Sequence, residues 1–134
     1  MNEKLEIKMK STFADIDRAW HKIRGLLRRE GIDKDALFDV RLSTEEALVN
    51  AVKHGNKMKN ELFVDVAVVC GDDRVEISVK DQGAGFDYNN LPDPTVDENA
   101  AKLCGRGIYL IRKLMDEVHF NKSGNEITMV KFLN

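Results

Sequence analysis

Hydrophobic residues recur with two different periods in the first part of the chain, and each period predicts a kind of secondary structure. Apolar and polar residues alternate over residues 5–9, which predicts an edge strand. Over residues 13–27 the apolar positions return every three or four residues, which predicts a helix that packs on a sheet and ends at Gly31. Asp33 is placed to cap a second long helix, which continues to about His54.

The rest of the pattern predicts two hairpins and a third helix. Residues 62–69 and 75–79 alternate as paired strands do, and residues 118–120 and 127–132 look like a closing hairpin. Helical spacing returns over residues 108–114. The order of elements predicts an α/β fold, a two-layer sandwich in which helices cover one face of a mixed, mostly antiparallel sheet.

Residues 87–104 lack periodicity and contain both prolines, which predicts a long loop. A lid that closes over a ligand and an ordinary surface loop both have this composition.

Composition narrows the class of protein. The 134 residues suit one domain over residues 1–134, and 43% hydrophobic with 33% charged residues is typical of a soluble globule. Neither a long apolar run nor a cleavable leader is seen, so we expect a cytoplasmic protein without a membrane segment. A net charge of -2 gives no basic stripe, which disfavours direct nucleic-acid binding and favours protein partners. Cys70 and Cys104 lack metal-site spacing and are expected to be reduced thiols.

The first candidate motif lies on the second predicted helix. Glu46 and Asn50 are one turn apart, so a carboxylate and a carboxamide share one face with His54. The amide oxygen suits a hard cation, and the carboxylate suits deprotonation of a nucleophile. Glu45 points about 100° away, which favours Glu46 as the base. A solvated helix face has the same pattern when it is taken alone.

The second motif follows a predicted strand. Asp81 comes directly after residues 75–80, where its carboxylate can accept a hydrogen bond from an exocyclic amine such as that of adenine. Gly83 and Gly85 let a flat ring approach the backbone, and Phe86 is placed to cover it. A plain turn uses the same residue types.

The third motif joins the loop to the third helix. The motif consists of Gly105, Arg106, Gly107 and Ile108, and its backbone N–H groups would be free to bind an anion. The predicted helix start at Gly107-Ile108 favours negative charge at the same place. Arg106 is suited to pairing with a terminal phosphate and to stabilising charge during transfer. A lone Gly-x-Gly before a helix is also common without a ligand.

The three motifs in this order resemble the GHKL (Bergerat-fold) ATPase superfamily of gyrase, the heat-shock protein of ninety kilodaltons, histidine kinases and MutL. The resemblance spans nearly the whole chain. Within this superfamily, the chain looks most like the bacterial anti-sigma factor serine/threonine-protein kinases. The features that carry this resemblance are the small size, the run over residues 46–56, and residues 105–108 leading into residues 114–118. The closing run over residues 124–129 is similar as well.

The resemblance implies ATP and Mg²⁺ as cofactors and assigns roles to individual residues. Asn50 matches the magnesium ligand, and Glu46 matches the general base that receives the proton of a serine or threonine hydroxyl. Asp81 matches the adenine reader, with Thr128 as its helper. The glycine segments match the base side and the phosphate side of the nucleotide site: Gly83, Gly85, Gly105, Arg106, Gly107 and Ile108. A direct phosphate contact by His54 stays open.

The resemblance also implies protein partners. These are a sequestered sigma factor and a STAS-type anti-anti-sigma antagonist that is phosphorylated on serine or threonine. A homodimer through the N-terminal strand and first helix is implied too. Phe13 and Trp20 are candidates for that surface, core burial being the alternative.

Three functions remain open from the sequence. The first is an anti-sigma protein kinase. The second is a non-catalytic ATP-gated binding switch that regulates another partner. The third is a stand-alone module related to histidine kinases, against which the lack of a histidine-bearing dimerisation helix counts.

Overall fold

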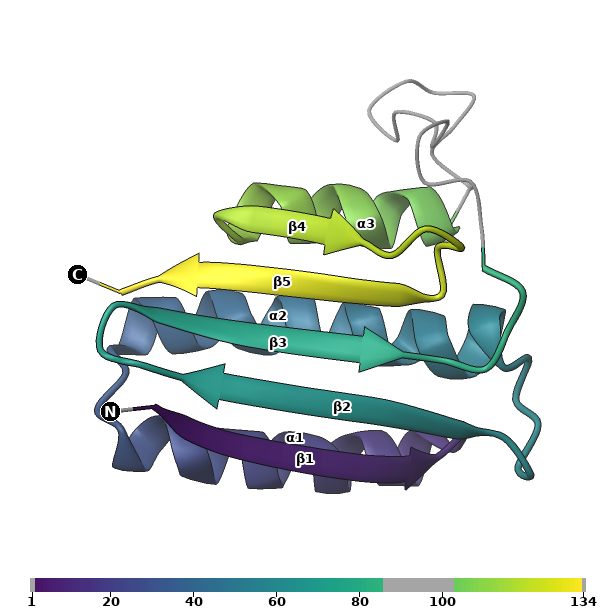
Figure 1. The fold of residues 1–134 in the computed structure, drawn as a ribbon, viewed down its shortest axis with the longest axis horizontal. Helices are drawn as coiled ribbons and strands as arrows, with labels where there is room; N and C mark the ends of the chain where they lie inside the picture. Colours follow the sequence, from purple (N-terminus) through teal and green to yellow (C-terminus); the bar gives the residue numbers. More distant parts are fainter. Residues whose placement is uncertain (1, 86–102, 134) are drawn as a thin grey trace.

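The computed structural model describes residues 2–85 and 103–133, the side chains of residues 103–106 excepted. A layer of helices covers one face of a five-stranded sheet, whose strand order is β1-β2-β3-β5-β4 (Figure 1). All four pairings between these described strands are antiparallel. The predicted two-layer α/β sandwich with helices on one face is confirmed.

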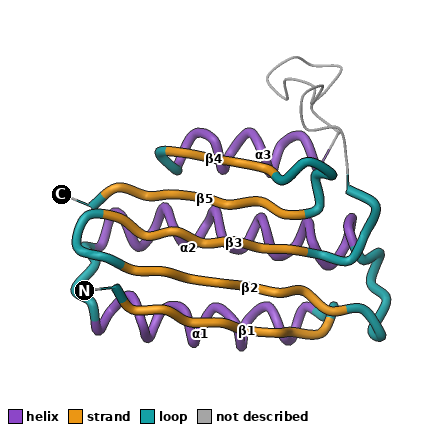
Figure 2. Tube along the Cα trace, in the orientation of Figure 1, coloured by secondary structure: helices purple, strands orange, loops and turns teal. Residues whose placement is uncertain are grey.

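The element bounds follow the predicted periods closely, except at the start of the third helix (Figure 2). A short π-helix, η1, continues α2 without a break and reaches Gly55, close to the predicted end of the second helix. The strands are β1 (Glu3–Lys10), β2 (Phe63–Cys70), β3 (Arg74–Lys80), β4 (Glu117–Phe120) and β5 (Glu126–Phe132). The helices are α1 (Phe13–Arg29), α2 (Lys34–Val49), η1 (Asn50–Gly55) and α3 (Leu103–Leu114).

Side-chain caps explain where α1 and α2 begin. The Thr12 hydroxyl accepts the Asp15 N–H at 3.1 Å, and the Asp33 carboxylate accepts the Ala36 N–H at 2.8 Å, as predicted for Asp33. Gly31 ends α1 with a φ of +79°, which a residue without a Cβ adopts at little cost.

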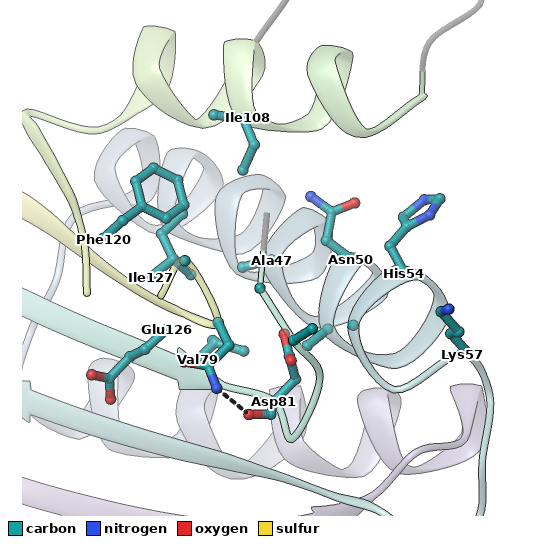
Figure 3. A pocket seen from close by; sticks show the side chains of 16 residues that line it. Ala47, Asn50, His54, Lys57, Val79, Asp81, Ile108, Phe120, Glu126 and Ile127 are labelled. Carbon is teal, nitrogen blue, oxygen red and sulfur yellow. Dashed lines mark hydrogen bonds between the residues drawn. The ribbon is translucent and has the colours of Figure 1, made fainter. Parts of the chain in front are cut away.

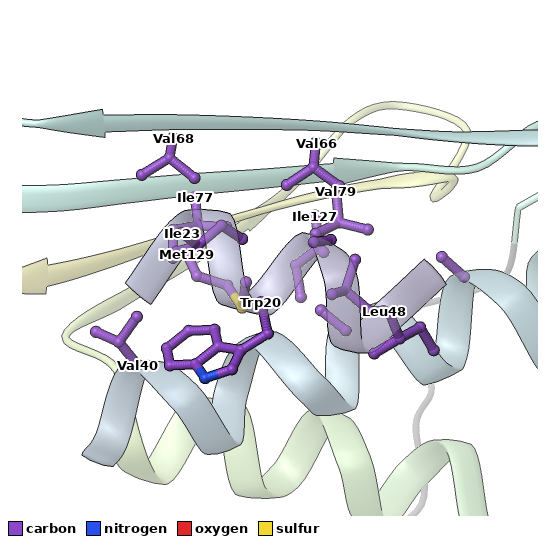
Figure 4. Packing of buried hydrophobic residues seen from close by; sticks show 14 of the residues in the cluster. Trp20, Ile23, Val40, Leu48, Val66, Val68, Ile77, Val79, Ile127 and Met129 are labelled. Atoms are coloured by element: carbon purple, nitrogen blue, oxygen red, sulfur yellow. The ribbon is translucent and has the colours of Figure 1, made fainter. Parts of the chain in front are cut away.

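One core lies between the sheet and the helical layer. Figure 4 shows Trp20 of α1 and Leu48 of α2 beneath strand residues such as Val66 and Ile77. Each aliphatic side chain buried in this way contributes about 1.5–3 kcal/mol. Trp20 is only 6% exposed and therefore belongs to the core, whereas Phe13 is 51% exposed. Of the two surface candidates, only Phe13 is at the surface.

Candidate functional site

The site is built around the junction of α2 and η1. Glu46 lies in the last turn of α2, and Asn50 is the first residue of η1. The wider π-helical turn is closed by the Asn56 N–H, which donates to the Ala51 carbonyl at 2.8 Å. Single π-helical turns within helices are rare and frequently occur at functional sites.

A pocket of about 210 Å³ opens between η1, α3 and the ends of β3 and β5. Figure 3 shows Asn50 and His54 on the helix side and Asp81 on the strand side of this pocket. Ile108 and Ile127 add apolar walls. An apolar slot with a few polar groups at its ends suits a flat heteroaromatic ring. We call this hollow the base pocket.

Asp81 is fixed at the base pocket by close backbone packing. The Gly83 N–H donates to the Asp81 Oδ1 at 2.7 Å. A Cβ on Gly55 would overlap the Asp81 carboxyl, and a Cβ on Gly83 would overlap the Gly55 carbonyl. Partial burial raises the pKa of the Asp81 carboxyl, and the Gly83 hydrogen bond offsets only part of that rise. Gly83 thus acts from behind Asp81, outside the pocket wall.

The turn between β4 and β5 closes the same end of the base pocket. Gly85 has a φ of +86°, and a Cβ there would overlap the Ser123 carbonyl. The Asn121 carboxamide accepts the backbone N–H groups of residues 124–126 at 2.9–3.1 Å, which fixes the turn. Asn125 Nδ2 donates to the Asp81 carbonyl at 3.3 Å. The sequence prediction missed Asn125, because an asparagine in a turn has no distinctive pattern.

A second hollow opens on the other side of Asn50, and we call it the catalytic hollow after the role that the sequence predicts for Glu46 in its lining. Its lining includes Glu46, Lys53 and Gly107, while Asn50 and His54 border both hollows. A Cβ on Gly107 would lie 2.9 Å from Glu46 Oε2 and 3.0 Å from Asn50 Nδ2, so glycine lets α3 approach both side chains. The prediction also missed Lys53.

Glu46 and Asn50 have no side-chain hydrogen bond or ion pair among the described residues, and both are partly exposed. Glu45 instead pairs with Arg41 at 3.1 Å, away from both hollows. Desolvation, with the neighbouring Lys53 charge, lowers the pKa of His54, which favours the neutral ring at pH 7. The geometry therefore distinguishes Glu46 from its neighbour as the sequence spacing did.

The third helix begins earlier than predicted. α3 starts at Leu103, so residues 105–107 lie inside its first turns and the expected helix start at Gly107 is wrong. The helix runs through both glycines, each of which costs about 1 kcal/mol relative to alanine. The N–H groups of its first turn, which have no partner within the helix, therefore belong to residues 103–106. The Arg106 side chain, Phe86 and most of the predicted loop over residues 87–104 lie outside the described residues.

Thr128 is not brought to the base pocket. Its neighbours Ile127 and Met129 belong to the core, so Thr128 points to the opposite face of the sheet. Its hydroxyl lies 3.0 Å from that of Ser78 on β3. The prediction that Thr128 helps Asp81 does not fit this position. The alternation of side chains along a strand already predicts that Thr128 lies on the face opposite Ile127 and Met129.

The described residues do not form a metal site from protein ligands alone. No group of three or more His, Cys, Asp or Glu side chains that could hold a metal occurs in residues 2–85 and 107–133. A metal at Asn50 would thus need oxygens from a bound ligand. In the same part of the chain, no helix combines the length and apolar character needed to span a bilayer.

Comparison with known proteins gives a consistent family. The model of the histidine kinase-like ATPase domain matches residues 9–131. The serine-protein kinase RsbW of Staphylococcus epidermidis is 35% identical over 119 residues, covering 83% of this chain and 75% of that protein. RsbW of Bacillus licheniformis is 37% identical over 123 residues, covering 84% and 74%. RsbW of Bacillus subtilis is 34% identical over 121 residues, also covering 84% and 74%.

A solved structure agrees at the level of the fold. The RsbU and RsbW domains of a Mycobacterium tuberculosis protein match with a TM-score of 0.63 at 20% identity. The match covers 97% of this chain and 32% of that one.

Proposed function

Because the chain belongs to the histidine kinase-like ATPase family, we propose that it is an ATP-dependent serine/threonine-protein kinase that also acts as an anti-sigma factor. Its similarity to serine-protein kinases over more than four fifths of its length supports this class of activity. The observation that carries the proposal is the position of Glu46 and Asn50 on one helix, between a base pocket and a second hollow.

Adenine would occupy the base pocket. The Asp81 carboxylate accepts a hydrogen bond from the exocyclic amine, while Ile108 and Ile127 contact the ring faces. Gly55, Gly83 and Gly85 allow the backbone to approach closely enough for this contact.

The phosphates would extend past Asn50 toward the start of α3. The segment proposed on the phosphate side consists of Gly105, Arg106, Gly107 and Ile108. It belongs to the first turns of α3, where N–H groups without a partner inside the helix attract anions. Lys53 adds a positive charge at the catalytic hollow. Mg²⁺, when bound, supplies charge neutralisation between phosphate oxygens. Asn50, whose amide oxygen is partly exposed and has no polar partner among the described residues, would hold such a cation, with the other ligands coming from nucleotide and water.

The acceptor hydroxyl would enter through the catalytic hollow, because the base pocket holds the nucleotide. The Glu46 carboxylate receives the hydroxyl proton as the new bond forms between the acceptor oxygen and the γ-phosphorus. The bond from that phosphorus to the bridging oxygen breaks, and ADP leaves. Arg106 is proposed to offset the developing charge.

The partners proposed are those that the family resemblance implies. They are a sigma factor and a STAS-type anti-anti-sigma antagonist, both cytoplasmic, with the antagonist as phosphate acceptor. Residues 1–134 would form a single domain. We also propose a homodimer through β1 and α1, where Phe13 is an exposed apolar residue.

The test is transfer of labelled γ-phosphate from Mg-ATP into host proteins by the purified chain, with Glu46→Ala alongside. Base-labile label on one small protein, lost in the variant, is expected. Binding of ATP without any transfer would replace the kinase with an ATP-gated binding switch. Acid-labile label would indicate transfer to histidine.

A further inference from the structure

Asn56 is a fully buried amide at the exit of η1, and it uses both of its polar atoms. It is 1% exposed. Its Nδ2 donates to the Ser11 hydroxyl at 2.8 Å and to the Phe63 carbonyl at 2.9 Å. Its Oδ1 accepts the Gln82 N–H at 2.8 Å. One side chain thereby joins the end of β1, the start of β2 and the turn that carries Asp81.

The turn is held at three consecutive residues. Asp81 and Gly83 pack against Gly55 so closely that a Cβ on either glycine would overlap this contact. Gln82, between them, is bound by Asn56, the residue after Gly55. The Gln82 side chain in turn accepts the Phe63 N–H. The residue pair 55–56 and the turn over residues 81–83 therefore form one packed unit.

The chain after Asn56 adopts a costly conformation. Lys57 and Met58 have φ values of +53° and +62°, a region that costs about 1–2 kcal/mol for a residue with a Cβ. The Met58 N–H donates to the Val52 carbonyl at 2.8 Å, and the Lys59 N–H donates to the Asn56 carbonyl at 3.0 Å. Such strain persists where surrounding contacts fix the backbone, and the carbonyls of Val52 and Asn56 supply contacts of this kind.

We propose that Asn56 is a positioning residue for nucleotide recognition, which holds Asp81 where its carboxylate meets the exocyclic amine of adenine. This inference rests on the proposed function, because it assumes that Asp81 reads the base. Asn56 itself lies outside the base pocket lining and acts through Gln82 and the backbone of the turn.

The experiment compares ATP with purine riboside triphosphate, which lacks the 6-amino group, by calorimetric titration of wild type and Asn56→Ala. The ratio of the two affinities reports the contact with the amine, whereas general loosening of the fold weakens both nucleotides together. Wild type should prefer ATP. In Asn56→Ala we expect this ratio to fall by about tenfold, mainly through loss of ATP affinity.

A second pair of variants keeps the test decisive if Asn56→Ala does not fold. Gln82 is exposed, so its side chain can be changed without emptying the core. Gln82→Met removes the acceptor of the Phe63 N–H and should lower the ratio by about threefold. Gln82→Glu keeps an acceptor oxygen and should leave the ratio unchanged.

The outcomes distinguish the positioning role of Asn56 from the recognition of adenine by Asp81. A preserved ratio in a folded Asn56→Ala protein, or equal loss for both nucleotides, overturns the role of Asn56. If that variant does not fold, an unchanged ratio in Gln82→Met does the same. Equal binding of both nucleotides by wild type overturns the reading of adenine by Asp81, and this inference with it.

Discussion

The base pocket and the catalytic hollow share Asn50 and His54, yet they are built in different ways. In the base pocket, Asp81 is hydrogen-bonded by Gly83, and its carboxyl packs against Gly55. In the catalytic hollow, Glu46 and Asn50 have no polar side-chain partner among the described residues. Within the part of the chain that the structure describes, the polar group of the first site is held by protein contacts, whereas the polar groups of the second have none.

The difference matches the chemistry proposed for each side. A base is recognised by shape and by one directional hydrogen bond, so rigidity before binding avoids an ordering cost. Phosphoryl transfer needs groups that engage a metal, a phosphate and an acceptor together. Groups already satisfied within the protein would have to exchange partners first. We therefore expect substitutions in the base pocket to change affinity and those in the catalytic hollow to change turnover.

The largest effect is expected at Glu46. Glu46→Gln should reduce phosphate transfer by about 10²–10⁴-fold, because an amide cannot receive the acceptor proton. ATP affinity should stay within about twofold, since the base pocket is untouched. The matched control is Glu45→Gln, whose side chain pairs with Arg41 and should leave turnover unchanged. Single-turnover transfer and calorimetric ATP binding measure the two quantities. Equal losses in both variants would remove Glu46 from its proposed role.

A large effect on affinity is expected at Gly55. Gly55→Ala places a methyl group on the Asp81 carboxyl, so ATP affinity should fall about 10–100-fold. The matched control is Gly25→Ala on α1, where the added Cβ meets only the end of Arg29 at 3.6 Å. That change should leave affinity unchanged and stabilise the helix by about 1 kcal/mol. Unaltered ATP binding by folded Gly55→Ala would contradict the packing argument.

A smaller effect on turnover is expected at Gly107. The methyl group of Gly107→Ala would lie 2.9 Å from Glu46 Oε2, so the carboxylate must move. We expect kcat to fall by about tenfold and the KM for ATP to change little. The melting temperature should rise, because alanine favours α3. A variant that is more stable and equally active would show that Glu46 tolerates the shift.

The smallest effect concerns stability and pH. Burial raises the pKa of Asp81 in the folded protein above its unfolded value, so the native state loses stability as pH rises through the folded pKa. Asp81→Asn removes this cost, and its melting temperature without nucleotide should exceed that of wild type at pH 7 by a few degrees at most. The difference should shrink as pH falls toward 3.8, the ordinary value for the carboxyl. Thermal melts across pH measure it, and a pH-independent difference would point to packing instead.

Site residues that are close in sequence can be placed relative to one another from the sequence alone. Glu46 and Asn50 lie one helical turn apart, so their common face follows from helix geometry alone. Glycines at positions 105 and 107 predict a boundary at Gly107, whereas α3 begins at Leu103. Gly107 is instead tolerated inside the helix by its contact with α2, and only the tertiary structure supplies that contact.

The sequence by itself determined the order of elements, the faces they bury and the Glu46–Asn50 pair, because these depend on local period and spacing. Only the tertiary structure decided that Gly55 and Asn56 meet the turn of Asp81. Asn56 and Gln82 are 26 residues apart in the chain, and the contact of the two segments depends on antiparallel pairing and close backbone approach. The local pattern of residues does not predict such packing, because this packing forms between elements that are distant in the chain.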